Sequence, residues 1–106
     1  MAFTNIKKLF IGGAPTNSTA VYTAPVAPLS QTQITRIKAH NTGAIQASIE
    51  LRDNHATNNL LYNLTILAGD TVEIADEWQL NAGQAIFAKA SAAGINLYIA
   101  GREYTE

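Results

Sequence analysis

The residues that could carry chemistry in this chain are few and widely spaced. His40 and His55 are its only histidines, and it contains no cysteine. A zinc site needs three or four ligands from histidine, cysteine or carboxylate side chains. Because the two histidines show no such local spacing, we interpret both as solvated surface residues. We expect neither a metal site nor a cofactor.

Four acidic residues lie close together in the second half of the chain, at Asp70, Glu73, Asp76 and Glu77. Paired carboxylates can serve in general acid–base catalysis or bind calcium. The spacing does not match an EF-hand loop, so a solvated loop flank is the better interpretation. The chain also lacks a phosphate-binding loop and a Gly-x-Ser-x-Gly nucleophile motif. We therefore expect no catalytic residues and no enzymatic activity.

Trp78, the only tryptophan, directly follows these acidic residues. An exposed indole can stack on a sugar ring, whereas a lone tryptophan in a small β protein is more often a core residue or an interface anchor. The sequence leaves these interpretations open. Tyr62 and Tyr98 are the other aromatic candidates for sugar binding.

Composition limits the classes of partner. The 106 residues fit one domain, and a hydrophobic fraction of 47% supplies one core. The charged fraction of 14% and net charge of −1 leave no basic cluster for nucleic acid. The N-terminus does not resemble a signal peptide, and no apolar run is long enough to span a bilayer. We expect neither a nucleic-acid nor a membrane partner.

Short alternating strands must position the side chains. Residues 44–52 alternate most cleanly, which predicts one face formed by Ile45, Ala47, Ile49 and Leu51, with Ile45 and Ile49 directed into the core. Residues 33–41 also alternate, with one face formed by Gln33, Thr35, Ile37, Ala39 and Asn41 and the other by Ile34, Arg36, Lys38 and His40. About eight short strands are predicted, within residues 6–11, 20–23, 33–41, 44–52, 60–67, 71–74, 85–90 and 95–104. Residues 77–80 form a further short strand or the end of a bend.

Glycine-containing turns separate these strands. The segments 41–43, 81–83 and 91–94 each end in glycine between alternating runs, which predicts hairpins. Strand spacing of roughly 8 to 12 residues is typical of antiparallel sandwiches. We predict a single all-β domain over 1–106, an antiparallel β-sandwich of jelly-roll type. Residues 1–20 would form an arm or an edge strand.

The outward phase of the strands carries large side chains. If Ile86 and Ala88 face the core, Phe87 faces outward, and if Leu97 and Ile99 face the core, so does Tyr98. One of the stripes Leu61/Leu67 and Tyr62/Ile66 also lies outside. Outward apolar groups with little charge favour a protein interface. The candidate interface residues are Phe87, Tyr98, Tyr62 and Trp78.

Several segments also resemble a known group of proteins. They are Val-Tyr-Thr-Ala-Pro at 21–25, Ile-Thr-Arg-Ile-Lys-Ala-His-Asn-Thr-Gly at 34–43, Leu-Asn-Ala-Gly-Gln-Ala-Ile-Phe-Ala-Lys-Ala at 80–90 and Ile-Ala-Gly-Arg-Glu-Tyr at 99–104. The chain after residue 20 resembles small all-β virion proteins of tailed bacteriophages. The first twenty residues lie outside the likeness.

The resemblance implies a non-enzymatic structural protein of the virion, assembled in the host cytoplasm. Capsid decoration or stabilisation is the leading expectation, with a neck or tail component as an alternative. The implied partners are further copies of the chain and a major capsid or other virion protein. The aromatic residues indicate an alternative of a different class, which is a carbohydrate-binding module for host attachment.

Overall fold

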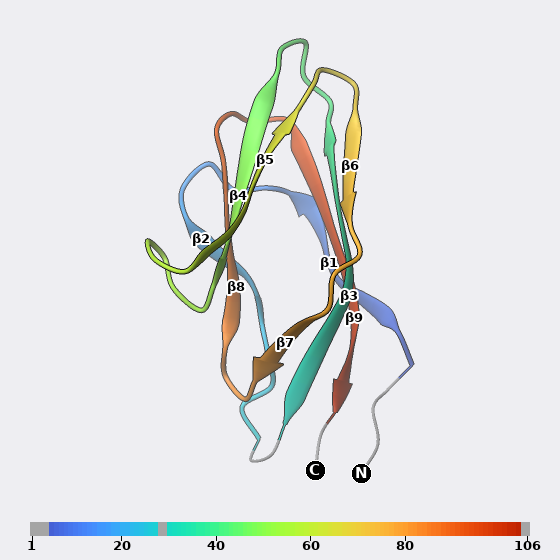
Figure 1. The fold of residues 1–106 in the computed structure, drawn as a ribbon, viewed down its shortest axis with the longest axis vertical. Helices are drawn as coiled ribbons and strands as arrows, with labels where there is room; N and C mark the ends of the chain where they lie inside the picture. The colour runs from blue at the N-terminus through green and yellow to red at the C-terminus, as the bar shows by residue number, and fades with distance from the viewer. Residues whose placement is uncertain (1–4, 28–29, 105–106) are drawn as a thin grey trace.

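A computed structural model describes residues 5–27 and 30–104. Over these residues, nine strands form two antiparallel sheets packed face to face (Figure 1), so the predicted β-sandwich is confirmed. Sheet A has the order β1-β9-β3-β6, with β7 also pairing with β3, and sheet B has the order β2-β8-β4-β5. The strands are β1 (Lys7–Gly13), β2 (Thr19–Thr23), β3 (Gln31–Asn41), β4 (Ala47–Asp53), β5 (Leu60–Ile66), β6 (Thr71–Ile74), β7 (Trp78–Asn81), β8 (Ala85–Ala90) and β9 (Ile95–Tyr104).

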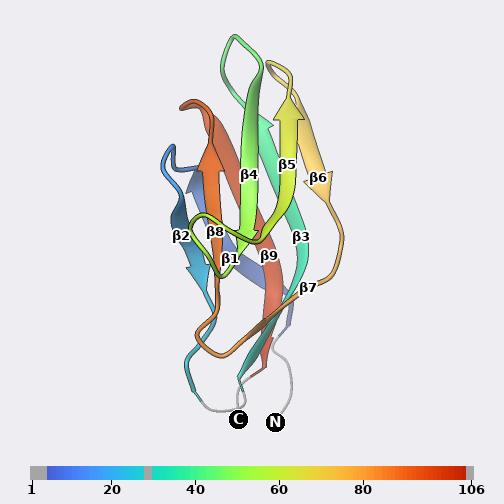
Figure 2. The ribbon, with the colours of Figure 1, turned by 60° about the vertical axis from the view of Figure 1, so that its left-hand side comes forward.

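The connections define a jelly roll. β6 and β7 pair with different stretches of β3, so together they form one interrupted edge strand. With these two counted as one position, the described strands fill four positions in each sheet. The chain crosses between sheets at almost every connection, whereas β4 and β5 pair as a hairpin within sheet B (Figure 2). This arrangement is that of a jelly roll.

Three predicted hairpins are connections between the sheets instead. The turns at 41–43, 81–83 and 91–94 join β3 to β4, β7 to β8 and β8 to β9, and none of these pairs shares a sheet. Turn residues specify where the backbone reverses. They do not specify which strand will lie beside the one that leaves the turn, because that depends on packing between distant segments.

Ile45 is not in the core, contrary to prediction. β4 begins at Ala47, and the side chain of Ile45 is 72% exposed in the loop before it. The carbonyl of Ile45 accepts a 2.8 Å hydrogen bond from the amide nitrogen Nδ2 of Asn41. This local bond holds residues 44–46 in a loop. Ala47, Ile49 and Leu51 are buried as expected.

The predicted face of β3 is correct only for its second half. Thr32 and Ile34 are buried, and beyond them Ile37, Ala39 and Asn41 are buried. A register shift between Ile34 and Arg36 inserts an extra residue opposite β9. Such a bulge reverses the side-chain phase. Strict alternation therefore assigned Gln33 and Thr35 to the wrong face.

Register shifts and a strand break lie in neighbouring strands of sheet A, close to Gly101. β1 shifts register opposite Ile99 and Ala100, β3 shifts opposite Ala100 and Gly101, and the break between β6 and β7 lies alongside. A Cβ atom on Gly101 would collide with the carbonyl oxygen of Gln33. Glycine thus permits the close approach of β3 to β9. Because bulges bend strands, these irregularities divide sheet A into two parts.

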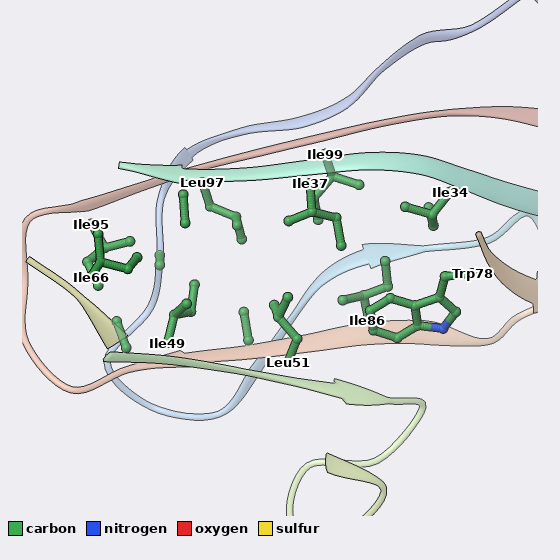
Figure 3. Packing of buried hydrophobic residues seen from close by; sticks show 14 of the residues in the cluster. Ile34, Ile37, Ile49, Leu51, Ile66, Trp78, Ile86, Ile95, Leu97 and Ile99 are labelled. Atoms are coloured by element: carbon green, nitrogen blue, oxygen red, sulfur yellow. The ribbon is translucent and has the colours of Figure 1, made fainter. Parts of the chain in front are cut away.

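The core fills the space between the sheets (Figure 3). Sheet A contributes large side chains that include Ile37, Leu97 and Ile99, and sheet B contributes Ile49, Leu51 and Ile86. The inward phases predicted for β8 and β9 are confirmed. Over the described residues no helix is present that could cross a membrane.

Polar contacts tie the layers together at both ends. At one end Asn41 Nδ2 donates to the carbonyl oxygens of Ile45 and Ile66, at 2.8 and 3.0 Å, so the loops after β3 and β5 stand side by side (Figures 1 and 2). At the other end the Tyr22 hydroxyl of sheet B lies 2.6 Å from Glu103 Oε2 of sheet A. Lys7 Nζ reaches Glu103 Oε1 at 2.8 Å.

The N-terminal segment forms part of the sandwich. Of residues 1–20, the structure describes 5–20, and β1 is an edge strand of sheet A. The alternative prediction, an N-terminal arm, also includes residues 1–4, which lie outside the described residues.

Candidate interface surfaces

The outer face of sheet A brings Tyr98 beside side chains from three other strands. Ile11 of β1 and Lys38 of β3 stand on either side of Tyr98, and Glu73 of β6 is paired with Lys38. Burial of Leu97 and Ile99 fixes Tyr98 on the outside. The phase predicted for β9 therefore places this tyrosine on the surface, partly buried by its neighbours.

Two shallow hollows flank the tyrosine. The first, of about 330 Å³, is lined by Ile11, Leu97 and Tyr98, with Lys38 and His40 among the polar residues. The second, of about 290 Å³, lies between Tyr98 and Ile6, with Thr35, Arg36 and Ala100 completing its lining. Ile11 is 65% exposed and Ile6 is 59% exposed.

Charged residues at the rim of these hollows are already paired. Arg36 Nε lies 3.1 Å from Glu73 Oε1, and Lys38 Nζ lies 3.9 Å from Glu73 Oε2. His40 Nδ1 is 2.7 Å from the hydroxyl of Thr71. Such exposed pairs stabilise the fold little. An apolar centre with a polar, hydrogen-bonded rim is the usual make-up of a protein interface.

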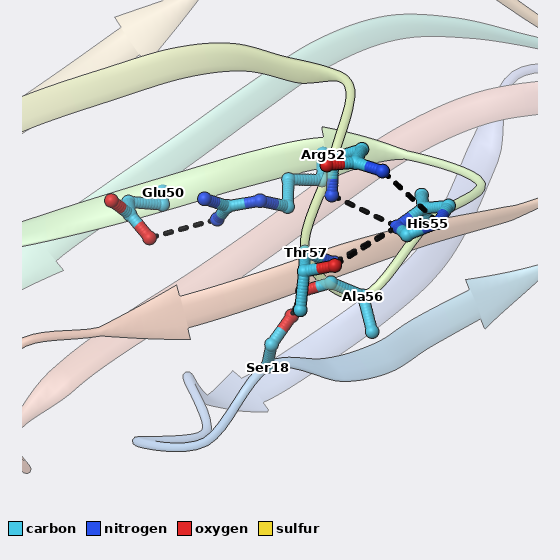
Figure 4. A network of polar contacts seen from close by, with 7 residues as sticks. Ser18, Glu50, Arg52, His55, Ala56 and Thr57 are labelled. Carbon is cyan, nitrogen blue, oxygen red and sulfur yellow. Dashed lines mark hydrogen bonds and ion pairs between the residues drawn. The ribbon is translucent and has the colours of Figure 1, made fainter.

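Phe87 lies on the opposite surface, the outer face of sheet B. It pairs with Ala20 on one side and Arg52 on the other. The loop after β4 passes over β8, where the Ser18 hydroxyl donates to the carbonyl of Ala56 (Figure 4). Phe87 is half-buried. Phe87 and Tyr98 thus both face outward but cannot belong to one contact patch.

His55 organises that same loop. Its Nδ1 atom accepts hydrogen bonds from the backbone amides of Thr57 and Asn58, at 3.0 and 2.8 Å (Figure 4). His40 lies on the outer face of sheet A, on the other side of the sandwich. Within the described part of the chain no group of three or more candidate ligands could hold a metal ion.

Trp78 lies in the core. Its side chain is 7% exposed and packs near Tyr62, with ring centroids 6.3 Å apart. The indole Nε1 donates a long, 3.4 Å hydrogen bond to Asp53 Oδ1. A sugar ring cannot stack on an indole buried in this way. Trp78 therefore joins β7 of sheet A to residues of sheet B and is not a surface anchor.

Tyr62 is half-buried, with its hydroxyl at the surface. It donates a 2.9 Å hydrogen bond to Asp76 Oδ2. Burial, together with this bond to a carboxylate, raises the pKa of Tyr62. Its ring lies on the inward stripe of β5, with Leu64 and Ile66, while Leu61 and Leu67 of the other stripe are exposed.

The acidic side chains along the edge of sheet A contact different partners. Glu73 pairs with Arg36 and Lys38, Asp76 accepts from Tyr62, and Glu77 accepts from the side-chain amide of Gln33. All of these carboxylates are exposed, as expected for a solvated flank. They do not converge on a common point.

Sequence reasoning missed the contribution of the first strand to the face around Tyr98. Ile11 reaches it because β1 pairs with β9 at the sheet edge, beyond a register shift near Leu9. The sequence shows an apolar run before Gly12-Gly13 but no sign of its distant partner. The pairing of β1 with the last strand is decided by the tertiary fold.

The fold and these surfaces define a class, an antiparallel jelly roll with outward apolar patches. Neither protein-family models nor curated proteins matched the sequence. Among solved structures, the chain is similar to a protein of Bacillus endospore appendages, described as a novel family of disulfide-linked pili. The TM-score is 0.56 at 11% identity, covering 97% of this chain and 88% of the other. This likeness concerns the fold alone.

Proposed function

We propose that this protein is a non-enzymatic structural subunit of a bacteriophage virion that decorates or stabilises the capsid through protein contacts. The observation that carries the proposal is the face around Tyr98. There Ile6 and Ile11 are largely exposed beside two hollows, and nearby charges are paired within the chain. Leaving apolar side chains in water is unfavourable, so a face of this kind favours burial against a partner.

The contact would be made by many modest interactions. The hollows suit apolar side chains of the partner, and the rim of Arg36, Lys38 and Glu73 carries more positive than negative charge. A partner surface with apolar projections and an acidic rim is complementary. A shell protein repeated many times in one lattice would gain stability from many copies of such a contact.

A subunit of an extracellular or tail fibre is the second candidate. It is supported by the fold likeness to the endospore pilus protein. The 106 residues contain no cysteine, so disulfide links of the kind named for that pilus are not available to them. Copies in a fibre would have to associate through noncovalent contacts.

The two candidates separate in a binding experiment with empty capsids of the phage that encodes the chain. Co-sedimentation of wild-type protein with capsids is expected, and Tyr98→Ser should weaken binding by roughly 30-fold or more, as for a central interface aromatic. Phe87→Ser is the matched control on the opposite face and should retain capsid binding. Wild-type protein that ignores capsids but forms filaments by electron microscopy would support the fibre and refute decoration.

A further inference from the structure

The free edge of sheet B at β5 differs from the other edges of the sandwich. Residues 60–67 read Leu-Leu-Tyr-Asn-Leu-Thr-Ile-Leu, with no charged residue and no proline. β4 pairs with one side of β5, and no strand among the described residues pairs with the other. An edge strand presents unpaired backbone N–H and C=O groups, and proteins normally protect such an edge with charge, proline or a bulge.

Both edges of sheet A have features that hinder pairing with a further strand. β1 carries Lys7 and Lys8 and shifts register between Lys8 and Phe10. The opposite edge is interrupted between β6 and β7, and it carries Glu73 with Asp76 and Glu77 in the break. The β2 edge of sheet B is short and shifts register between Ala20 and Tyr22.

β5 has none of this protection along its centre. From Tyr62 to Ile66 it pairs regularly with β4, and the register shift falls only near Leu60, at one end. Leu60 is 45% exposed and Leu61 is 50% exposed, while Asn63 and Thr65 are also exposed. The edge is therefore regular, uncharged and flanked by accessible leucines.

We propose that two copies of this chain associate through their β5 edges, which pair antiparallel across a two-fold axis and join the two B sheets into one. The inference deepens the proposed structural role and rests on it, because it names the surface through which copies meet. It places this contact away from the face around Tyr98, which remains free for a different partner.

A second copy is the occupant that fits this edge best. In an antiparallel pair of identical strands about a two-fold axis, each donor faces an acceptor, and contacts occur twice. No like charges meet, because β5 carries none. Asn63 is the middle residue of β5, and its amide both donates and accepts, so it can pair with its own counterpart.

The contact is expected to be weak for isolated dimers. A single strand pair buries less than the roughly 1,200 Å² of a standard stable interface. Dimers should therefore appear as protein concentration rises from the micromolar to the millimolar range. Neighbouring copies held on an assembly would associate more readily, because their effective concentration is high.

Cysteine cross-linking tests the geometry directly, because the chain has no cysteine of its own. Single substitutions Leu61→Cys, Asn63→Cys and Thr65→Cys place one thiol on the outer side of β5. Thr23→Cys on the exposed end of β2 is the matched control. Under diamide oxidation, at least one β5 variant should form a disulfide-linked dimer, since facing strands bring Cβ atoms within bridging range. The control should not.

Sedimentation equilibrium supplies the second measurement. Wild-type association should depend on concentration, and Asn63→Lys should lower the association constant by roughly fivefold or more, with circular dichroism checking that the fold is kept. A wild-type chain that is monomeric at all concentrations would overturn the inference. So would cross-linking that appears only when the Thr23→Cys and β5 variants are mixed, because it would indicate head-to-tail pairing of β5 with β2.

The outcome is separable from that of the proposed function. Tyr98→Ser leaves β5 intact, so it should retain cross-linking in the Asn63→Cys background while losing capsid binding. A chain that cross-links through β5 but never binds capsids would refute decoration and keep the dimer. A chain that binds capsids but stays monomeric would refute the dimer and support decoration.

Discussion

Gly101 shows how one missing side chain shapes sheet A. Bulges in β1 and β3 converge on it, and the backbone of β3 approaches closely enough that a Cβ atom would collide with Gln33. The approach depends on glycine for space and not for unusual dihedral angles. A strand glycine of this kind marks close backbone contact.

Replacing Gly101 with alanine should therefore destabilise the protein by about 3 kcal/mol or more, the cost of overpacking against fixed backbone. Gly13→Ala is the matched control, because nothing lies within 4 Å of its added Cβ. Urea unfolding of both variants measures the difference. Equal stabilities would contradict the close approach of β3 and β9.

Glu103 is a second residue with a measurable signature. Hydrogen bonds from Lys7, and then from Tyr22, hold the pKa of Glu103 below its usual value. Burial, reinforced by the same carboxylate, raises the pKa of Tyr22 well above its usual value. The ionised carboxylate is thus the form that the folded protein favours.

A carboxylate with a lowered folded pKa stabilises the fold above its unfolded pKa, near about 4.3 for glutamate, and this stabilisation disappears as pH falls through the folded pKa. Glu103→Gln should reduce the loss of stability on acidification below about pH 5. Urea midpoints recorded from neutral to acid pH test this. The double variant Tyr22→Phe/Glu103→Gln should show the same acid dependence of stability as Glu103→Gln alone. If Glu103→Gln has the same acid dependence as the wild-type protein, the stabilising contact between Tyr22 and Glu103 is excluded.

At the scale of elements, Asn41 connects two loops that sequence patterns treated separately. It is 1% exposed, donates to the carbonyls of Ile45 and Ile66, and accepts from the amide of Gly43 at 2.9 Å. The turn that resembled a hairpin is thus a cross-sheet connection held by a buried amide. Ile45 and Leu67 are exposed at the tips of these loops.

The variant Asn41→Asp removes both donations while keeping the acceptor for Gly43. We expect a loss of about 3 kcal/mol, because the part-buried carbonyl of Ile45 and the buried carbonyl of Ile66 lose their donor and face a carboxylate. Asn96→Asp, at an exposed position of β9, should change stability by less than about 0.5 kcal/mol. Thermal unfolding followed by circular dichroism compares the two, and similar melting temperatures would count against the role of Asn41.

The elements themselves were largely predictable from alternation, because each strand shows its phase locally. β6, β8 and β9 have the predicted bounds, and β5 begins as predicted and ends at Ile66, just short of the predicted end. The failures in β3 and β4 have two causes of the same kind. A bulge at Thr35 and a side-chain hydrogen bond from Asn41 interrupt the alternation, and neither changes the residue pattern.

At the scale of the whole molecule, the sandwich presents three distinct surfaces. The outer face of sheet A carries Tyr98, the outer face of sheet B carries Phe87, and the β5 edge has no charged residue. Proposed shell docking and proposed pairing of copies use different surfaces. A subunit can therefore make both contacts at once.

The sequence by itself determined the β-sandwich class, the approximate positions of most strands and the outward phase of Phe87 and Tyr98, because side-chain alternation is a local property of the chain. The tertiary structure alone decided which strands became neighbours, that Trp78 lies in the core, and that Ile11 stands beside Tyr98. These features depend on contacts between segments far apart in the sequence. Register and sheet order are fixed by the combined packing of both layers, which no single segment encodes.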